Sequence, residues 1–134
     1  MEDGTPYGIG RVGLRAGGAA SLAEFAREMK ELLHVPGVRF LDAGKPVHKV
    51  AVGGGSCGSM LSQVAAHGCD TFVTADLKHD MYLEARDLGV NLLDAGHHAT
   101  EALICPVVAD WLREAFPAVA VEVTRHQGEV FAAL

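Results

Sequence analysis

The chain has 134 residues, of which 49% are hydrophobic, and a length of this order buries one modest core, so we expect a single domain over residues 1–134. Its formal net charge of −6 is scattered and its basic residues form no stripe, which disfavours nucleic-acid binding. It has no apolar run near the roughly 20 residues of a membrane span and no signal-peptide pattern, so we expect a cytoplasmic protein with no membrane contact.

Strand-like and helix-like segments alternate along the chain. After a strand over 9–14, Ser21 and Glu24 form a capping-box pattern, and a helix with apolar residues at helical spacing runs to Leu33. Next come strands over 38–41 and 49–52, a helix over 59–67, a strand over 71–74, a helix over 78–88, a strand over 90–93, a helix over 106–116 and a strand over 119–123. This order predicts an α/β fold with a mixed, mostly parallel sheet flanked by helices.

A glycine-rich loop follows the strand over 49–52 and leads into a helix. Three of its glycines fit the G-x-G-x-x-G pattern of dinucleotide-binding loops, and Asp76 follows near the end of the next strand, where a ribose-binding acid would lie. The same glycines also suit a tight turn, and free amides at a helix start bind anions. The structural turn, the phosphate or nucleotide site and the dinucleotide site all remain open. The predicted cofactor-binding residues are Gly54, Gly55, Ser56 and Gly58.

A serine-nucleophile pattern overlaps the same loop. Gly54, Ser56 and Gly58 fit G-x-S-x-G, and Asp94 and His97 follow in the chain order of a hydrolase triad. Asp94 and His97 are only three residues apart, whereas a triad takes its acid and base from separate loops. A serine hydrolase is therefore disfavoured.

Polar residues also follow the strand over 71–74. Asp76 either caps the next helix, with His79 in its solvated first turn, or takes part in a functional site. Functional residues of α/β proteins gather at the carboxyl ends of parallel strands, and the polar residues after Val52, Thr74 and Leu93 all lie at such ends. We expect these clusters to meet on one rim, where His79 handles a proton or a substrate phosphate.

The segment over 92–101 carries the strongest chemical pattern. His97 and Glu101 are four residues apart, so a helical turn brings their β-carbons within roughly 5–6 Å and lets them share a cation. Asp94 is predicted to orient the His97 side chain without itself binding the cation. Pro106 interrupts helical hydrogen bonding, which indicates that the pair lies on a single turn rather than on a long helix.

Taken in this order, the glycine loop, the T-x-D-x-K-H segment over 74–79 and the D-x-G-H-x-x-x-E segment over 94–101 resemble the NIF-three-like family, whose members are often labelled GTP cyclohydrolase 1 type 2 homologs. The resemblance covers nearly the whole chain from Gly8. It implies a dinuclear site for divalent zinc, manganese, iron or magnesium ions, with His97 and Glu101 as ligands. It therefore favours metal binding over the alternative that His97 and Glu101 only lie on a solvent-exposed face of a helix.

The same resemblance implies that the chain is the C-terminal portion of a longer protein. In that family an adjacent histidine pair and an aspartate complete the metal site from an N-terminal half. The expected function is a metal-dependent hydrolase acting on a nucleotide or phosphoester, in a homo-oligomer. The alternative is a scaffold or regulatory module whose metal is structural.

Overall fold

The fold is described from a computed structural model, which describes residues 8–130. Its centre is one sheet with the strand order β1-β3-β4-β5-β2. The strands are β1 (Arg11–Leu14), β2 (Arg39–Leu41), β3 (Lys49–Val52), β4 (Thr71–Thr74) and β5 (Asn91–Asp94). The central strands β3, β4 and β5 run parallel, whereas β1 and β2 pair antiparallel at the two edges. This confirms the predicted mixed sheet, in which two of the four strand pairs are parallel.

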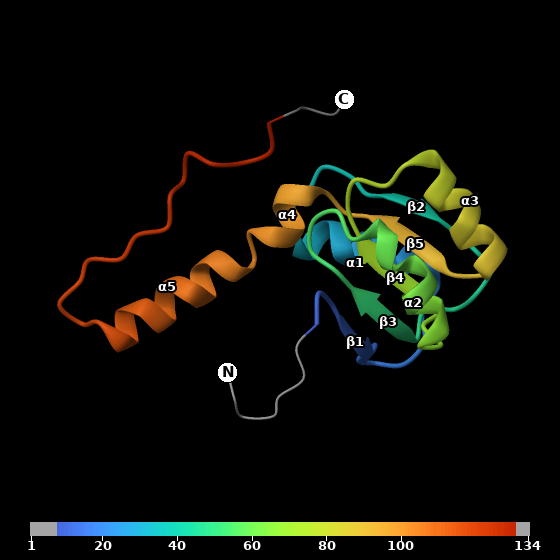
Figure 1. Cartoon of the computed structure of the whole chain (residues 1–134), viewed down its shortest axis with the longest axis horizontal. Helices are drawn as coiled ribbons and strands as arrows, with labels where there is room; N and C mark the ends of the chain where they lie inside the picture. Colours follow the sequence, from blue (N-terminus) through green and yellow to red (C-terminus); the bar gives the residue numbers. More distant parts are fainter. Residues whose placement is uncertain (1–7, 131–134) are drawn as a thin grey trace.

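Helices cover both faces of the sheet (Figure 1). The helices of the described residues are α1 (Leu22–Leu32), the 3-10 helix η1 (Gly58–Met60), α2 (Leu61–Ala66), α3 (His79–Leu88), α4 (His97–Glu101) and α5 (Ile104–Ala115). Because side chains alternate along a strand, Phe72 and Leu92 pack with residues of α2 and α3, while Val73 and Leu93 pack against α1. Two apolar cores thus hold the central strands between helices.

The start of α1 is the predicted capping box. The Ser21 hydroxyl accepts from the Glu24 amide at 3.3 Å, and the Glu24 carboxylate accepts from the Ser21 amide at 3.0 Å. The Ser21 hydroxyl also donates to the Glu24 carboxylate at 2.7 Å, and this hydrogen bond, together with the one from the Ser21 amide, lowers the pKa of Glu24. Leu22, Phe25 and Ala26 are buried against the sheet, as the helical spacing predicts.

The C-terminal region departs from prediction. Helix α5 projects from the body of the molecule, and the segment after it is irregular (Figure 1). The predicted strand over 119–123 was therefore wrong. The Arg113 guanidinium donates to the Val121 carbonyl oxygen at 2.8 Å, so this segment is tied to α5 instead of adding to a sheet edge. None of the helices within residues 8–130 is long and apolar enough to cross a membrane.

Candidate metal centre

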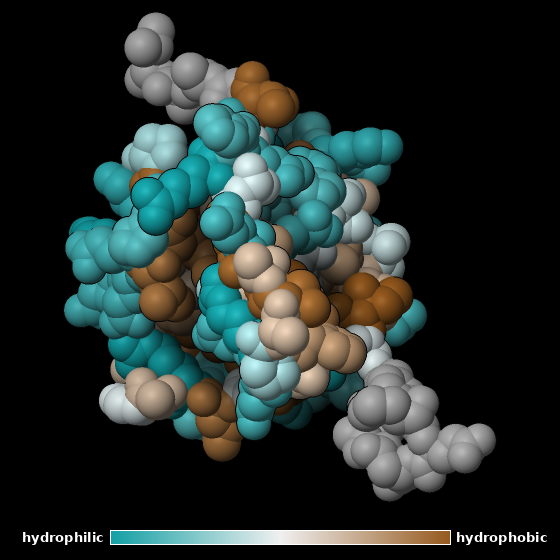
Figure 2. Space-filling model, turned by 90° about the vertical axis from the view of Figure 1, so that its left-hand side faces the viewer, coloured by the Kyte–Doolittle hydropathy of each residue, from teal (hydrophilic) through white to brown (hydrophobic). Residues whose placement is uncertain are grey.

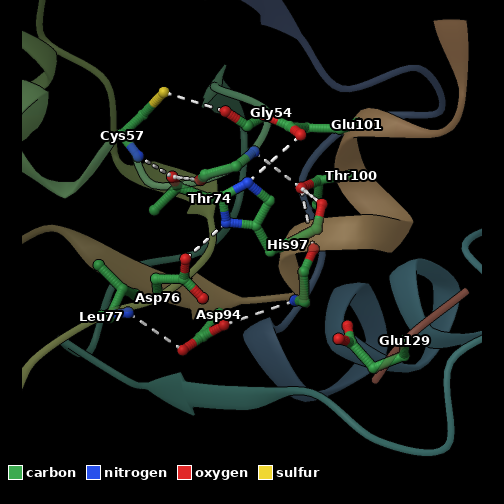
Figure 3. Close-up of polar contacts among 12 residues, drawn as sticks. Gly54, Cys57, Thr74, Asp76, Leu77, Asp94, His97, Thr100, Glu101 and Glu129 are labelled. Atoms are coloured by element: carbon green, nitrogen blue, oxygen red, sulfur yellow. Dashed lines mark hydrogen bonds and ion pairs between the residues drawn. The ribbon is translucent and has the colours of Figure 1, made fainter. Parts of the chain in front are cut away.

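Three loops meet at the carboxyl ends of the parallel strands (Figure 3). The glycine loop follows β3, Asp76 follows β4, and α4 with His97 and Glu101 follows β5. The loops meet because neighbouring parallel strands end at the same edge of a sheet. The predicted convergence of the three polar segments on one rim is confirmed.

His97 lies between two carboxylates (Figure 3). Its Nδ1 is 2.5 Å from Oδ2 of Asp76, and its Nε2 is 3.3 Å from Oε2 of Glu101. His97 and Glu101 are the first and last residues of the single turn α4, which ends before α5 begins at Ile104. The prediction that this pair occupies one short turn is confirmed.

The two contacts define the protonation of the ring. A carboxylate only accepts hydrogen bonds, so Nδ1 of His97 carries a proton and donates it to Asp76. In the neutral ring, Nε2 of His97 would then carry a lone pair that faces the Glu101 carboxylate. Nε2 and this carboxylate oxygen are 3.3 Å apart, and two such acceptors need a positive charge between them. A proton on Nε2 provides that charge in the metal-free protein. Accordingly, the hydrogen bond to Asp76, with the charge of Glu101, raises the pKa of His97.

Asp76 is held in an uncommon backbone conformation. Its φ is +55°, in the left-handed region that non-glycine residues seldom occupy, and Asp is among the few that tolerate it. Helix α3 starts at His79 with Lys78 as its N-cap residue, so of the two alternatives for Asp76 the capping role is wrong. Its carboxylate instead binds His97, which also leaves the dinucleotide interpretation without its acidic residue.

The glycine loop lies directly against this pair. A Cβ atom on Gly55 would be 2.4 Å from Oε1 of Glu101 and 3.0 Å from Nε2 of His97, and Gly55 has a φ of +62°. A Cβ atom on Gly54 would be 3.2 Å from the carbonyl oxygen of Thr100. Glycine at positions 54 and 55 therefore lets the loop backbone lie close to His97 and Glu101, where a side chain would clash.

Several amides of the glycine loop are already engaged within the protein. The Gly53 amide donates to the Val73 carbonyl oxygen at 2.9 Å, and the Gly55 amide donates to the Thr100 hydroxyl at 3.0 Å. The Cys57 amide donates to the Thr74 hydroxyl. These hydrogen bonds are those of a structural turn, and they leave fewer amides for an anion.

The remaining two predicted residues of the loop have different surroundings. Ser56 is exposed. A Cβ atom on Gly58 would be 2.4 Å from the Met81 sulfur, so Gly58 allows η1 to pack closely on α3. Anion binding by Gly54, Gly55, Ser56 and Gly58 stays a prediction.

None of the contacts described for Asp94 reaches the His97 ring, so its role in orienting the imidazole stays a prediction and would act through other groups. The buried carboxylate pairs with the Arg39 guanidinium and accepts from the amides of Leu77 and Gly96 at 3.3 and 3.4 Å. This pairing also means that Asp94, His97 and Ser56 do not form a serine-hydrolase triad. Asp76 occupies the orienting position, because β4 ends beside β5.

His79 is exposed at the start of α3, and none of the described contacts joins it to His97. Its catalytic role stays a prediction. Within residues 8–130 no group of three or more His, Cys, Asp or Glu side chains is arranged around a common metal position. His97 and Glu101 are therefore the two candidate ligands, while Asp76 binds the opposite side of the imidazole ring.

Two features of the centre were missed by sequence reasoning. The Asp76 to His97 contact joins residues from neighbouring strands, and only the strand order could have suggested it. The second feature is the contact of Thr100 with the glycine loop. Its hydroxyl accepts from Gly55 and donates to carbonyl oxygens of its own turn, and no sequence pattern marks this role.

The fold and the centre define an α/β domain with a one-turn helix that carries a potential metal-binding pair. A family model described as Duf34/NIF3 (NGG1p interacting factor 3) matches residues 3–129, so the chain belongs to this family. It is 36% identical over 94 residues to a protein named GTP cyclohydrolase 1 type 2 homolog from Staphylococcus aureus. That match covers 69% of this chain and 25% of the relative.

Solved structures share the fold. A Bacillus cereus protein related to NIF3 matches 95% of this chain and 36% of its own with a TM-score of 0.87 and 30% identity. A Staphylococcus aureus protein matches 96% of this chain and 43% of its own with a TM-score of 0.83 and 28% identity. The aligned part of this chain thus spans about a quarter of the curated relative and less than half of each solved structure.

Proposed function

We propose that this chain supplies His97 and Glu101 to a divalent metal site, dinuclear in the complete protein, of a metal-dependent hydrolase. The observation that carries the proposal is that Nε2 of His97 and the Glu101 carboxylate face each other at 3.3 Å on one helical turn, where a divalent cation would replace the proton between them. Zinc, manganese, iron and magnesium are the cations considered. A bound cation of this kind polarises a phosphoryl oxygen and lowers the pKa of water.

The chain's own residues support this role. Asp76 fixes the tautomer of His97 so that Nε2 is free to bind a cation, the arrangement common behind metal-ligating histidines. Thr100 ties the glycine loop to α4 through its hydroxyl, which keeps Gly55 against the pair. The Asp76 contact restrains the His97 ring and the Thr100 contact restrains the glycine loop, both without a bound cation.

For the substrate we propose a nucleotide or another phosphoester. The name of the curated relatives motivates this class. A cavity of about 1080 Å³ adjoins the His97 turn through Asp94 and Gly96, and the exposed cation Arg39 and His98 line it. Its size suits a small ligand, and the Arg39 side chain, although paired with Asp94, stays exposed as a hydrogen-bond donor for a phosphate.

Metal binding is tested by calorimetric titration of the 134-residue chain with Mn²⁺ or Zn²⁺. With two protein ligands we expect weak binding that a chelator reverses and that His97→Ala or Glu101→Ala removes. His98→Ala is the control, because His98 neighbours the pair without taking part in it. Tight stoichiometric binding that persists in His97→Ala would exclude His97 from the site. Catalysis is tested separately, by hydrolysis of a panel of nucleotides and phosphoesters with the metal-loaded protein.

A second candidate function is a scaffold or regulatory module whose metal is structural. The observation that favours it is the apolar surface of α5 and the residue after it, where Trp111 is 62% exposed and Phe116 is 56% exposed. Figure 2 looks toward the end of the molecule from which α5 projects and shows hydrophobic side chains at the surface there. We propose self-association through this surface in a cytoplasmic protein. A metal-loaded protein that assembles but hydrolyses no member of the panel would favour this function.

A further inference from the structure

Asp94 is a buried carboxylate placed between the two loops that build the centre. It is 7% exposed at the end of β5. It accepts from the amide of Leu77, the residue after Asp76, and from the amide of Gly96, the residue before His97. Figure 3 shows Asp94 below the His97 ring, with its carboxylate directed to these loops and not to the ring.

The negative charge of Asp94 is compensated from a third element. Arg39, on the edge strand β2 that pairs with β5, binds the Asp94 carboxylate. The Arg39 side chain is 71% exposed and the Asp94 side chain is 7% exposed, so Arg39 binds Asp94 from the solvent side. A buried carboxylate needs such a partner and further hydrogen bonds to offset the loss of hydration.

We propose that Asp94 is a positioning residue of the metal centre, which fixes the spacing of Asp76 and His97 through the backbone amides beside them. The inference rests on the proposed function, because its consequence is the affinity of His97 and Glu101 for a cation. The bond between Asp76 and Nδ1 of His97 spans two loops, and Asp94 is the side chain that hydrogen-bonds the backbone of both. Arg39 supports Asp94 in this role.

Asp94→Asn tests the proposal, since the amide keeps the size of the side chain and loses its charge and one acceptor. Mn²⁺ affinity is measured by paramagnetic broadening of the NMR signals of His97 and Glu101. The tautomer of His97 is measured in the metal-free protein at pH 9 by long-range ¹⁵N–¹H correlation. We expect about tenfold weaker Mn²⁺ binding, as is typical when a group behind a metal ligand is lost, and a mixture of both tautomers.

Asp70→Asn is the matched control. Asp70 lies just before the opposite end of β4 and binds the amides of His48 and Lys49. The same substitution there removes an equivalent carboxylate far from His97, so it should lower the stability without changing the Mn²⁺ affinity or the His97 tautomer. Equal effects of Asp70→Asn and Asp94→Asn would overturn the proposal, and so would wild-type Mn²⁺ affinity in Asp94→Asn.

Failure of the proposed function gives a different result. If the wild-type chain shows no Mn²⁺ broadening at His97, the metal site itself is refuted, and the tautomer alone decides the role of Asp94. If Asp94→Asn does not fold, Arg39→Met takes its place, because Arg39 is mostly exposed. An unchanged His97 tautomer in that variant would then overturn the proposal.

Discussion

At the residue scale, Asp76 determines the state of the His97 ring. Asp76→Asn removes the charged acceptor at Nδ1, so the pKa of His97 should fall and the proton is no longer restricted to Nδ1. We expect Mn²⁺ binding to weaken by roughly 10–100-fold. NMR titration of His97 and calorimetry measure the two effects. Asp80→Asn, an exposed position in the first turn of α3, should leave both unchanged. A His97 pKa equal to that of the wild type would contradict the role of Asp76.

Gly55 is the residue of the glycine loop that lies against His97 and Glu101. In Gly55→Ala the new Cβ would lie 2.4 Å from Oε1 of Glu101, so Glu101 must move and the metal affinity should be lost. The positive φ of Gly55 adds roughly 1–2 kcal/mol of backbone strain.

The Gly44→Ala variant distinguishes the effect of backbone strain from the effect of displacing Glu101. Gly44 has a φ of +78°, and a Cβ atom there meets nothing within 4 Å. This variant should lose similar stability in a urea titration and keep the metal affinity of the wild type. Equal metal affinity in Gly55→Ala and Gly44→Ala would show that Gly55 serves only as a turn.

Sequence spacing could predict the pairing of His97 with Glu101, because one helical turn decides it. The partner on the other side of the ring could not be predicted in the same way. Asp94 is closer to His97 in sequence, yet Asp76 lies closer in space, because β4 and β5 are parallel neighbours. Contacts between elements depend on strand order, which local patterns do not contain.

At the scale of the element, the capping box supports α1, which covers one face of the sheet. Ser21→Ala should lower the free energy of unfolding by about 1 kcal/mol, measured by urea denaturation. Ser59→Ala, at an exposed serine of η1, is the control and should have little effect. A stability of Ser21→Ala equal to that of the wild type would mean that the cap contributes nothing.

The same cap has a predictable pH dependence. The hydrogen bonds from Ser21 lower the pKa of Glu24 in the folded chain, so this contribution is present above the pKa of Glu24 in the unfolded chain. It is lost as the pH falls through the lower, folded pKa. Denaturation of the wild type and Ser21→Ala across this range should show the two stabilities converging at acid pH. A constant difference would contradict the assignment.

Local sequence patterns predict most of the helices and strands, but they do not predict the structure of the segment over 119–123. The capping box and helical spacing predict α1 well, and apolar runs predict the central strands. The alternating valines over 119–123 also read as a strand, but a strand needs a free sheet edge, and the Arg113 contact holds this segment at α5.

At the scale of the whole molecule, α5 exposes several large apolar side chains, Trp111 among them. We expect the chain to self-associate through it at micromolar concentration, giving a dimer or larger species in light scattering. Trp111→Glu should shift the chain to a monomer, because it places a charge in that surface. Ile9→Glu is the control, at an exposed apolar residue outside the helices. A monomeric wild type would contradict this expectation.

The family could be recognised from the order of three short motifs, while the composition of the complete centre could not be obtained from this chain. The match covers only 25% of the curated relative, and the proposed site takes two ligands, His97 and Glu101, from this chain. Residues beyond the aligned region of those relatives are where further ligands are expected.

The central claim is that a divalent cation binds between His97 and Glu101. The most direct measurement is anomalous diffraction from crystals of the 134-residue chain soaked in Mn²⁺. We predict an anomalous peak roughly 2 Å from Nε2 of His97 and from a Glu101 oxygen, with the Asp76 contact at Nδ1 retained. A peak elsewhere, or no peak at His97 while Glu101 keeps its 3.3 Å contact, would contradict the claim.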